Sequence, residues 1–278
     1  MTLTLAYSPC PNDCFIFDAL VHKKIDTEGL EFEVQLGDVE TLNRQALSAG
    51  PDITKLSFHA YAHALDNYIL LRAGSALGFN CGPLLIKSNN RAIEQKNPSE
   101  WHVAIPGKLT TANFLLSLAY PAIKNKTELV FNEIEEALLQ NKFDAGLIIH
   151  ESRFTYQEKG LKKILDLGEF WDSLIHAPIP LGGIVIKRSL PNDIQQKVNR
   201  LIRKSVEFAF NNPEEPMPYV RAHAQEMSEA VMRQHIELYV NAFSLDLGEK
   251  GIEAVKLMFN KATELGIFSF DKQKLIID

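Results

Sequence analysis

Short apolar runs alternate with amphipathic stretches along the first part of the chain. Apolar and polar residues alternate with a period of two over residues 30–36, which is typical of a strand. One helix is predicted over 13–24 with Asn12 or Asp13 as its cap, and a second ends at Gly50. The strands predicted in this part span residues 3–7, 30–36, 53–57, 68–73 and 83–87.

The same alternation returns after the polar stretch 88–100. Strands are predicted at residues 101–105, 128–131, 145–149 and 183–187. Helices are predicted at residues 112–120 and 133–140 between these strands, and at 193–210, 229–243 and 251–265 in the last third. Because strands and helices alternate, we expect parallel βαβ units. The pattern predicts an α/β protein whose last third is helical.

This succession of elements indicates two α/β lobes, each a mixed β-sheet flanked by helices. We expect lobe I to comprise residues 1–87 and 189–278, and lobe II residues 88–188. The hinge crossings between the lobes are predicted near 84–90 and 180–190. A protein with two such lobes has its natural ligand site in the cleft between them.

Composition and charge narrow the classes of partner. The chain has 278 residues, of which 46% are hydrophobic and 23% charged, and its net charge is -6. An acidic balance argues against general binding to nucleic acid or anionic membrane. The first residues carry no basic segment, and no apolar run is long enough to span a bilayer, so we expect a cytoplasmic protein. Three cysteines do not suggest a disulfide framework.

The apolar run 145–149 leads directly into His150. Open α/β sheets bind ligands at the carboxyl ends of their strands, and histidine is suited to proton transfer near neutral pH. His150 is therefore a candidate general base, although a histidine at a strand end can also simply bond a loop. Arg153 follows it and can pair with a substrate anion, or form an ion pair with Glu151 or Glu158.

A glycine and two threonines, Gly107, Thr110 and Thr111, separate a predicted strand from a predicted helix. Free N–H groups and the partial positive charge of a helix N-terminus favour a carboxylate or phosphate there. The spacing is not that of a P-loop. The alternative is that one threonine only caps its helix.

Two further polar segments follow predicted strands. Lys55 and Ser57 offer a cation and a hydroxyl; the alternative is an exposed lysine and a helix cap. The loop 8–13 contains two prolines that stiffen it, so it either holds Ser8 and Asn12 toward a ligand or only directs the first helix.

His59 and His63 have the i, i+4 spacing of a helical zinc site, but the glutamate of the HExxH motif is absent. We therefore expect no metal there. The other histidines, His22, His102, His176, His223 and His235, lie in predicted helices or polar stretches and need no functional role.

Taken in order, these segments resemble the 1,4-dihydroxy-6-naphthoate synthases of the futalosine route to menaquinone. The resemblance spans essentially the whole chain and is carried by residues 8–13, 15–17, 38–43, 54–57, 106–107, 110–111, 146–156 and 239–246. It implies a fold like that of the type II periplasmic binding proteins. It also implies a lyase that converts cyclic dehypoxanthine futalosine to 1,4-dihydroxy-6-naphthoate without a metal or organic cofactor.

The resemblance also implies roles for individual residues. The family's proposed proton acceptor matches His150, and its ligand-contacting segments match Lys55, Leu56 and Ser57 together with Thr110, Thr111 and Ala112. The partner would be a small molecule that carries a carboxylate, not nucleic acid or a membrane. The sequence gives no oligomeric state.

Two other functions are considered. Chorismate dehydratase acts in the same route and would share the fold, but segments 8–13 and 150–154 favour the synthase. A solute-binding protein would use the same cleft without chemistry; the expected absence of a signal peptide and a histidine placed as a base argue against it.

Overall fold

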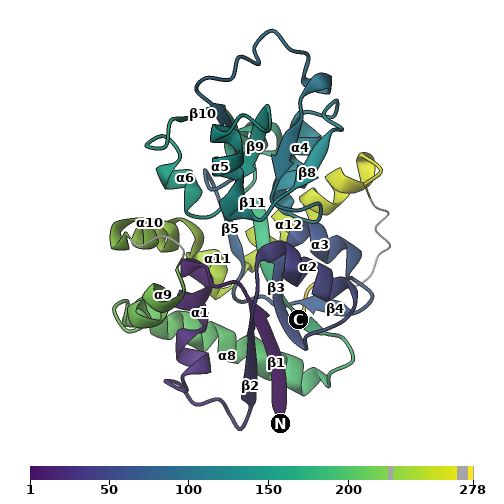
Figure 1. The fold of residues 1–278 in the computed structure, drawn as a ribbon. Helices are drawn as coiled ribbons and strands as arrows, with labels where there is room; N and C mark the ends of the chain where they lie inside the picture. The colour runs from purple at the N-terminus through teal and green to yellow at the C-terminus, as the bar shows by residue number, and fades with distance from the viewer. Residues whose placement is uncertain (225–227, 268–274, 278) are drawn as a thin grey trace. The chain divides into compact units, whose positions relative to one another are not determined.

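The computed structural model describes residues 1–224, 228–267 and 275–277. The chain forms two compact units, one of residues Met1–Gly78 and Pro180–Asp278, and the other of Phe79–Ile179. Each unit has its own sheet (Figure 1). The chain is thus mixed α/β with two sheets flanked by helices, as predicted.

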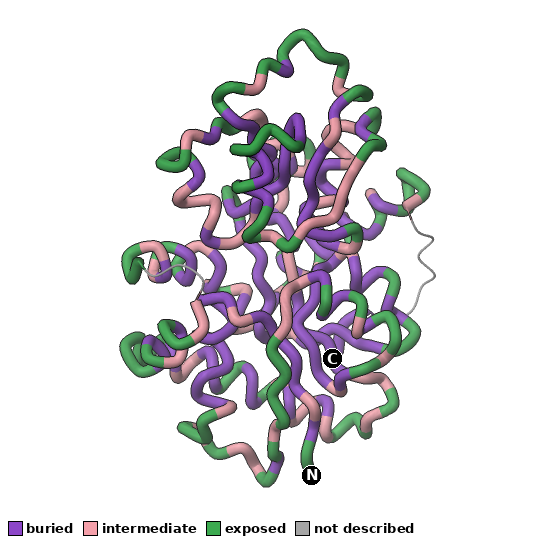
Figure 2. Tube along the Cα trace, viewed as in Figure 1, coloured by how far each residue is buried: buried purple, intermediate pink, exposed green. Residues whose placement is uncertain are grey.

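The sheet of the first unit has the order β2-β1-β3-β11-β4, and β5 also pairs with β11. β1 (Thr2–Tyr7) lies parallel to β2 (Glu31–Leu36) and β3 (Ile53–Ser57). β11 (Ile179–Lys187) runs antiparallel to β3 and to β4 (Tyr68–Leu70), and β5 spans Ala76–Gly78. Figure 2 shows β3 buried throughout and β2 largely exposed, as expected for a central and an edge strand.

Eight helices are described in the first unit; their bounds are α1 Pro11–Val21, α2 Val39–Leu47, α3 Phe58–His63, α8 Asn192–Asn211, α9 Met217–His223, α10 Glu229–Tyr239, α11 Ala242–Leu245 and α12 Gly248–Glu264. α1 contacts α8, α9 and α10, whereas α2 contacts β3 and α3 (Figure 1). One apolar core joins β1, α1 and α8 through side chains such as Leu5, Phe17 and Ile202. This burial holds α1 in place directly after the carboxyl end of β1.

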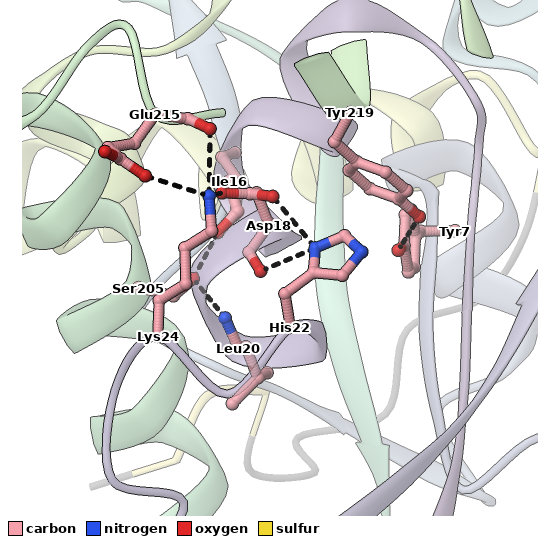
Figure 3. Close-up of polar contacts among 9 residues, drawn as sticks. All are labelled: Tyr7, Ile16, Asp18, Leu20, His22, Lys24, Ser205, Glu215 and Tyr219. Carbon is pink, nitrogen blue, oxygen red and sulfur yellow. Dashed lines mark hydrogen bonds and ion pairs between the residues drawn. The ribbon is translucent and has the colours of Figure 1, made fainter. Parts of the chain in front are cut away.

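Polar contacts fix α1 further (Figure 3). The hydroxyl of Ser205 on α8 donates to the carbonyl of Ile16 at 2.6 Å and accepts from the N–H of Leu20 at 3.2 Å. The buried carboxylate of Asp18 pairs with Lys24 at 2.8 Å and with His22 at 2.9 Å. These bonds fix the middle and the carboxyl-terminal end of the helix.

The sheet of the second unit has the order β10-β6-β9-β7-β8. Its strands are β6 Leu84–Ser88, β7 Val103–Ile105, β8 Lys126–Glu128, β9 Ala145–Ile148 and β10 Leu161–Asp166. β7 lies parallel to β8 and β9, whereas β6 runs antiparallel to β9 and β10. The helices are α4 Thr111–Ala119, α5 Ile134–Leu139, α6 Ser152–Thr155 and α7 Leu167–Ile175, with short 3-10 helices η1 Pro98–Glu100 and η2 Phe131–Glu133.

The units divide at 78/79 and 179/180, earlier at each crossing than the predicted 87/88 and 188/189. The reason is strand pairing: β6 belongs to the second sheet and β11 to the first. β11 also begins before the predicted start at residue 183. Gly183 lies inside this strand, and a Cβ there would lie 2.5 Å from Leu70 Cδ1, so the glycine permits close packing.

Several local predictions were wrong. Cys10, not Asn12 or Asp13, occupies the N-cap of α1, because the helix begins at Pro11. The predicted helix 229–243 is interrupted after Tyr239, where Asn241 caps the separate helix α11.

The other errors concern strands. Residues 128–131 are not a strand, since β8 ends at Glu128 and η2 begins at Phe131. β10 and α7 were not predicted. In β10 a register irregularity between Lys163 and Leu165 disturbs the alternation that marks a strand. No helix among the described residues combines the length and apolarity needed to cross a bilayer.

Candidate functional site

In the second unit, the segments that follow β7 and β9 lie at the same edge of the sheet. The two strands are parallel neighbours, with Val103 opposite Ala145 and Ala104 opposite Gly146. β7 leads to the turn before α4, and β9 leads to His150. The predicted base and the predicted anion seat are therefore brought to one edge of one sheet.

His150 lies two residues beyond the last residue of β9, as predicted, and its side chain is half-buried. Its backbone is left-handed, with φ 57°. This conformation is uncommon for a residue with a Cβ and often marks a functional position. The ring of Phe131 packs edge-on against the imidazole, with centroids 5.0 Å apart and planes at 68°. The backbone turn and this ring contact restrict the orientation of His150.

Arg153 has a partner that the sequence analysis did not name. Its guanidinium donates to the carboxylate of Asp166 at 2.6 Å. Asp166 is brought close because β10 ends at this residue and α7 begins directly after it.

Thr110 and Thr111, at the start of α4, have different positions and therefore different roles. Thr110 is the N-cap: its hydroxyl accepts from the N–H of Asn113 at 3.2 Å and donates to the carbonyl of Gly107 at 2.8 Å. The capping interpretation thus holds for Thr110. Thr111 and Ala112 are the first two helical residues and are buried. N–H groups at these positions have no acceptor within an α-helix.

In the first unit, a buried polar network lies at the carboxyl ends of β1 and β3. The ammonium of Lys55 lies 3.0 Å from Asp13 Oδ1 and donates to the carbonyl of Gly74 at 2.8 Å. Lys55 is therefore not the exposed lysine of the alternative interpretation. Asp13 also accepts from Ser8 Oγ at 2.8 Å and from Asn12 Nδ2 at 2.9 Å. A buried carboxylate needs such donors, so the loop 8–13 has a polar role besides directing α1.

His235 of α10 extends this network. Its Nε2 lies 2.9 Å from Asn12 Oδ1. Since an amide oxygen only accepts, Nε2 must carry the proton. The side chain of His235 is fully buried, so this bond satisfies a group that would otherwise be costly to bury.

Asn43 of α2 holds Ser57 in place. Its Oδ1 accepts from the N–H of Ser57 at 2.9 Å, and its Nδ2 donates to Ser57 Oγ at 3.3 Å. Ser57 occupies the N-cap position of α3, but its side chain makes no capping bond. The capping alternative for Ser57 therefore holds for its position but not for its side chain.

An ion cluster fixes the amino end of β9. Asp144 Oδ1 accepts from Arg91 at 2.7 Å and Lys96 at 2.8 Å, and its Oδ2 accepts from the N–H of His102 at 3.0 Å. Burial alone would raise the pKa of Asp144, but these donors outweigh it and lower the pKa to about 2. The carboxylate stays ionised and holds the amino end of β9, which is the end away from His150.

Sequence reasoning missed three members of these clusters: Asp13 and His235 in the network around Lys55, and Asn43 beside Ser57. A signal existed for two of them. Asn43 and His235 lie on buried helix faces, next to Leu42 and Ile236. A polar residue within an apolar stripe needs a partner.

His59 and His63 of α3 have ring centroids 5.4 Å apart, and burial lowers the pKa of His63.

Comparison with known proteins identifies the family. A family model described as menaquinone biosynthesis matches residues 3–264. A 1,4-dihydroxy-6-naphthoate synthase from Thermus thermophilus is 44% identical over 99% of both chains. The protein of that name from Streptomyces coelicolor is 41% identical, over 96% of this chain and 94% of its own.

Solved structures identify the fold. The crystal structure of a protein from Archaeoglobus fulgidus is similar with a TM-score of 0.90 and 34% identity, over 96% of this chain and 98% of its own. A Candida albicans protein described as having the generic periplasmic binding protein fold matches with a TM-score of 0.72 and 12% identity, over 100% and 98% of the two chains. The fold is thus periplasmic-binding-protein-like, and the chain belongs to the menaquinone biosynthesis family.

Proposed function

We propose that this protein is a 1,4-dihydroxy-6-naphthoate synthase, a carbon–carbon lyase of menaquinone biosynthesis. It converts cyclic dehypoxanthine futalosine to 1,4-dihydroxy-6-naphthoate and releases a three-carbon sugar fragment. Two relatives of that name, similar over nearly their whole length, support the assignment. The structural observation that carries it is the placement of His150 and the first turn of α4 at one edge of one sheet.

In this proposal His150 is the general base. A neutral imidazole removes a proton from the substrate and so starts the opening of the sugar ring. The left-handed backbone at His150 and the ring of Phe131 support the role, because a base must be held in a narrow range of orientations.

The first turn of α4 binds the substrate carboxylate. The N–H groups of Thr111 and Ala112 are at the positive end of the helix, and the Thr111 hydroxyl adds a side-chain donor. Thr110 contributes indirectly, since its hydroxyl caps the helix and keeps the turn in shape.

The segment Lys55, Leu56 and Ser57 supplies the second set of contacts. Ser57 Oγ accepts from Asn43, which leaves its own hydrogen for an oxygen of the substrate. Donors of this kind stabilise negative charge that develops on oxygen. Leu56 pairs with Gly183 of β11, and the charge of Lys55 is shared with Asp13, so these two residues act mainly by holding Ser57 in place.

The proposed reaction relies on these side chains and backbone groups, without a metal or organic cofactor. The ligand cleft between lobes, the hinge crossings and the cytoplasmic location stay predictions.

Incubation of the purified protein with cyclic dehypoxanthine futalosine, followed by chromatography, tests the function. We expect 1,4-dihydroxy-6-naphthoate to form. A solute-binding protein would return the compound unchanged, and a chorismate dehydratase would instead consume chorismate in a parallel incubation. Either outcome, obtained with folded protein, rules out the synthase.

A further inference from the structure

Arg153 connects the His150 segment to two other parts of the second unit. Besides its ion pair with Asp166, its guanidinium donates to the carbonyl of Asn80 at 3.0 Å and to that of Gly82. Asn80 and Gly82 belong to the stretch by which the chain enters this unit, whose first residue is Phe79. One side chain thus joins three backbone segments.

We infer that Arg153 is a positioning residue for His150, which holds the base in its working orientation. This inference rests on the proposed function. The link between the two residues is short: the N–H of Arg153 donates to the carbonyl of His150 at 3.3 Å, within the turn that begins α6. A shift of the guanidinium is therefore passed to the backbone from which the imidazole projects.

The acceptors of Arg153 are themselves fixed. Asp166 is buried, and its Oδ1 accepts from the N–H groups of Gly168 at 2.8 Å and Glu169 at 3.2 Å as the N-cap of α7. Gly82 packs directly on Gly168, since a Cβ on Gly82 would lie 2.2 Å from the nitrogen of Gly168. The guanidinium is therefore anchored to a rigid frame.

A second anchor restrains the same turn from the side of α5. Ser152 Oγ donates to the buried carboxylate of Glu135 at 3.0 Å, which also pairs with Lys159 at 2.8 Å. Phe131, just before α5, contacts the His150 ring. The two anchors hold the His150 turn from two sides. Ser152 links it to α5, and Arg153 links it to Asp166 at the start of α7.

The chemistry explains why arginine is needed. A planar guanidinium carries five N–H donors in a fixed arrangement, so it can serve a carboxylate and two carbonyls at once. The ammonium of lysine is a point charge and cannot reach the same three acceptors in one position. Arg153→Lys should therefore keep the ion pair with Asp166 but lose the link to Asn80 and Gly82.

The test compares Arg153→Met and Arg153→Lys with wild type, and uses Arg91→Met as the matched control. Arg91 also pairs with a buried carboxylate of this unit, but at the amino end of β9. We expect kcat to fall about 10- to 100-fold in Arg153→Met, because a small misplacement of a catalytic group has effects of this size, and to fall less in Arg153→Lys. KM should change little, and Arg91→Met should keep the wild-type kcat.

A double variant separates positioning from general damage. When Arg153→Met is added to His150→Ala, kcat should fall no further, because Arg153 acts only through the imidazole. Wild-type kcat in Arg153→Met, or an equal loss of kcat with and without His150, would overturn the inference. If Arg153→Met does not fold, Arg153→Lys takes its place in the same comparison.

A spectroscopic readout keeps the inference separate from the proposed function. The ring resonance of His150 in the NMR spectrum, assigned by its loss in His150→Ala, should shift in Arg153→Met and stay in place in Arg91→Met. An unshifted resonance contradicts the positioning role whether or not the protein forms the naphthoate. A shifted resonance in a protein that forms no naphthoate rejects the proposed function and leaves the structural link intact.

Discussion

The carboxylate of Asp13 and the ammonium of Lys55 lie 3.0 Å apart, and both side chains are buried. Removal of one member of a buried ion pair leaves the other charge without its partner. We expect Asp13→Asn to lower the free energy of unfolding by about 3 kcal/mol, measured by urea denaturation. The control is Glu207→Gln, which breaks the exposed pair with Arg203 and should leave stability nearly unchanged.

A second substitution shows whether charge is the cause. Adding Lys55→Met to Asp13→Asn removes the unpaired ammonium and should restore part of the lost stability. If Asp13→Asn alone is as stable as wild type, the ion pair does not stabilise the fold.

Thr110 and Thr111 should respond differently to substitution. Thr110→Ala removes a helix cap, so the free energy of unfolding should fall by about 1 kcal/mol, while KM should rise less than in Thr111→Val. Thr111→Val keeps the shape but removes a donor to the substrate carboxylate, so KM should rise by about tenfold. The reverse pattern, measured by urea denaturation and steady-state kinetics, would contradict the division of roles.

The stabilisation that Asp144 provides should be lost in acid. Burial raises the pKa of Asp144, but the His102 N–H, Lys96 and Arg91 lower it by more than burial raises it. The pKa is about 2, against an ordinary value near 3.8. A pKa below the unfolded value stabilises the folded state above that value, and this contribution is lost as the pH falls. We expect about 2 kcal/mol to disappear between about pH 5 and pH 2.

The variant Asp144→Asn isolates this contribution. It should be less stable than wild type at pH 7, and the difference in free energy of unfolding should shrink as the pH falls toward 2. A difference that does not depend on pH would show that the carboxylate is not the group responsible.

The left-handed backbone of His150 predicts an unusual order of stability. With φ at 57°, alanine carries the steric penalty of a Cβ whereas glycine does not. We expect His150→Gly to be more stable than His150→Ala by about 1 kcal/mol, measured by urea denaturation. Since both variants lack the imidazole, the comparison reports on the backbone alone, and a more stable alanine variant would contradict the strain.

Features that depend on neighbouring residues could be predicted from the sequence. The strand at residues 53–57 matches β3, and His150 lies beyond β9 as the apolar run indicated. Thr110 caps α4 because a capping side chain acts on backbone only three residues away. Local spacing is sufficient for such features.

Features that depend on tertiary contacts could not be predicted from the sequence. The partner of Lys55 is Asp13, which lies far away in the sequence and meets it only because β1 and β3 are neighbours. Likewise, Arg153 has acidic residues nearby in sequence but pairs with Asp166. This residue is brought to it by β10, a strand whose register irregularity disturbs the alternating pattern. Sheet order decides both pairs, and no local pattern encodes it.

The central claim is that His150 is the base of a naphthoate-forming lyase. Wild type and His150→Ala should be given cyclic dehypoxanthine futalosine in excess, and the formation of 1,4-dihydroxy-6-naphthoate followed by chromatography. We expect the wild type to form the product and the variant, although folded, to have a kcat lower by about 10²–10⁴-fold. A kcat near that of wild type in His150→Ala would contradict the account.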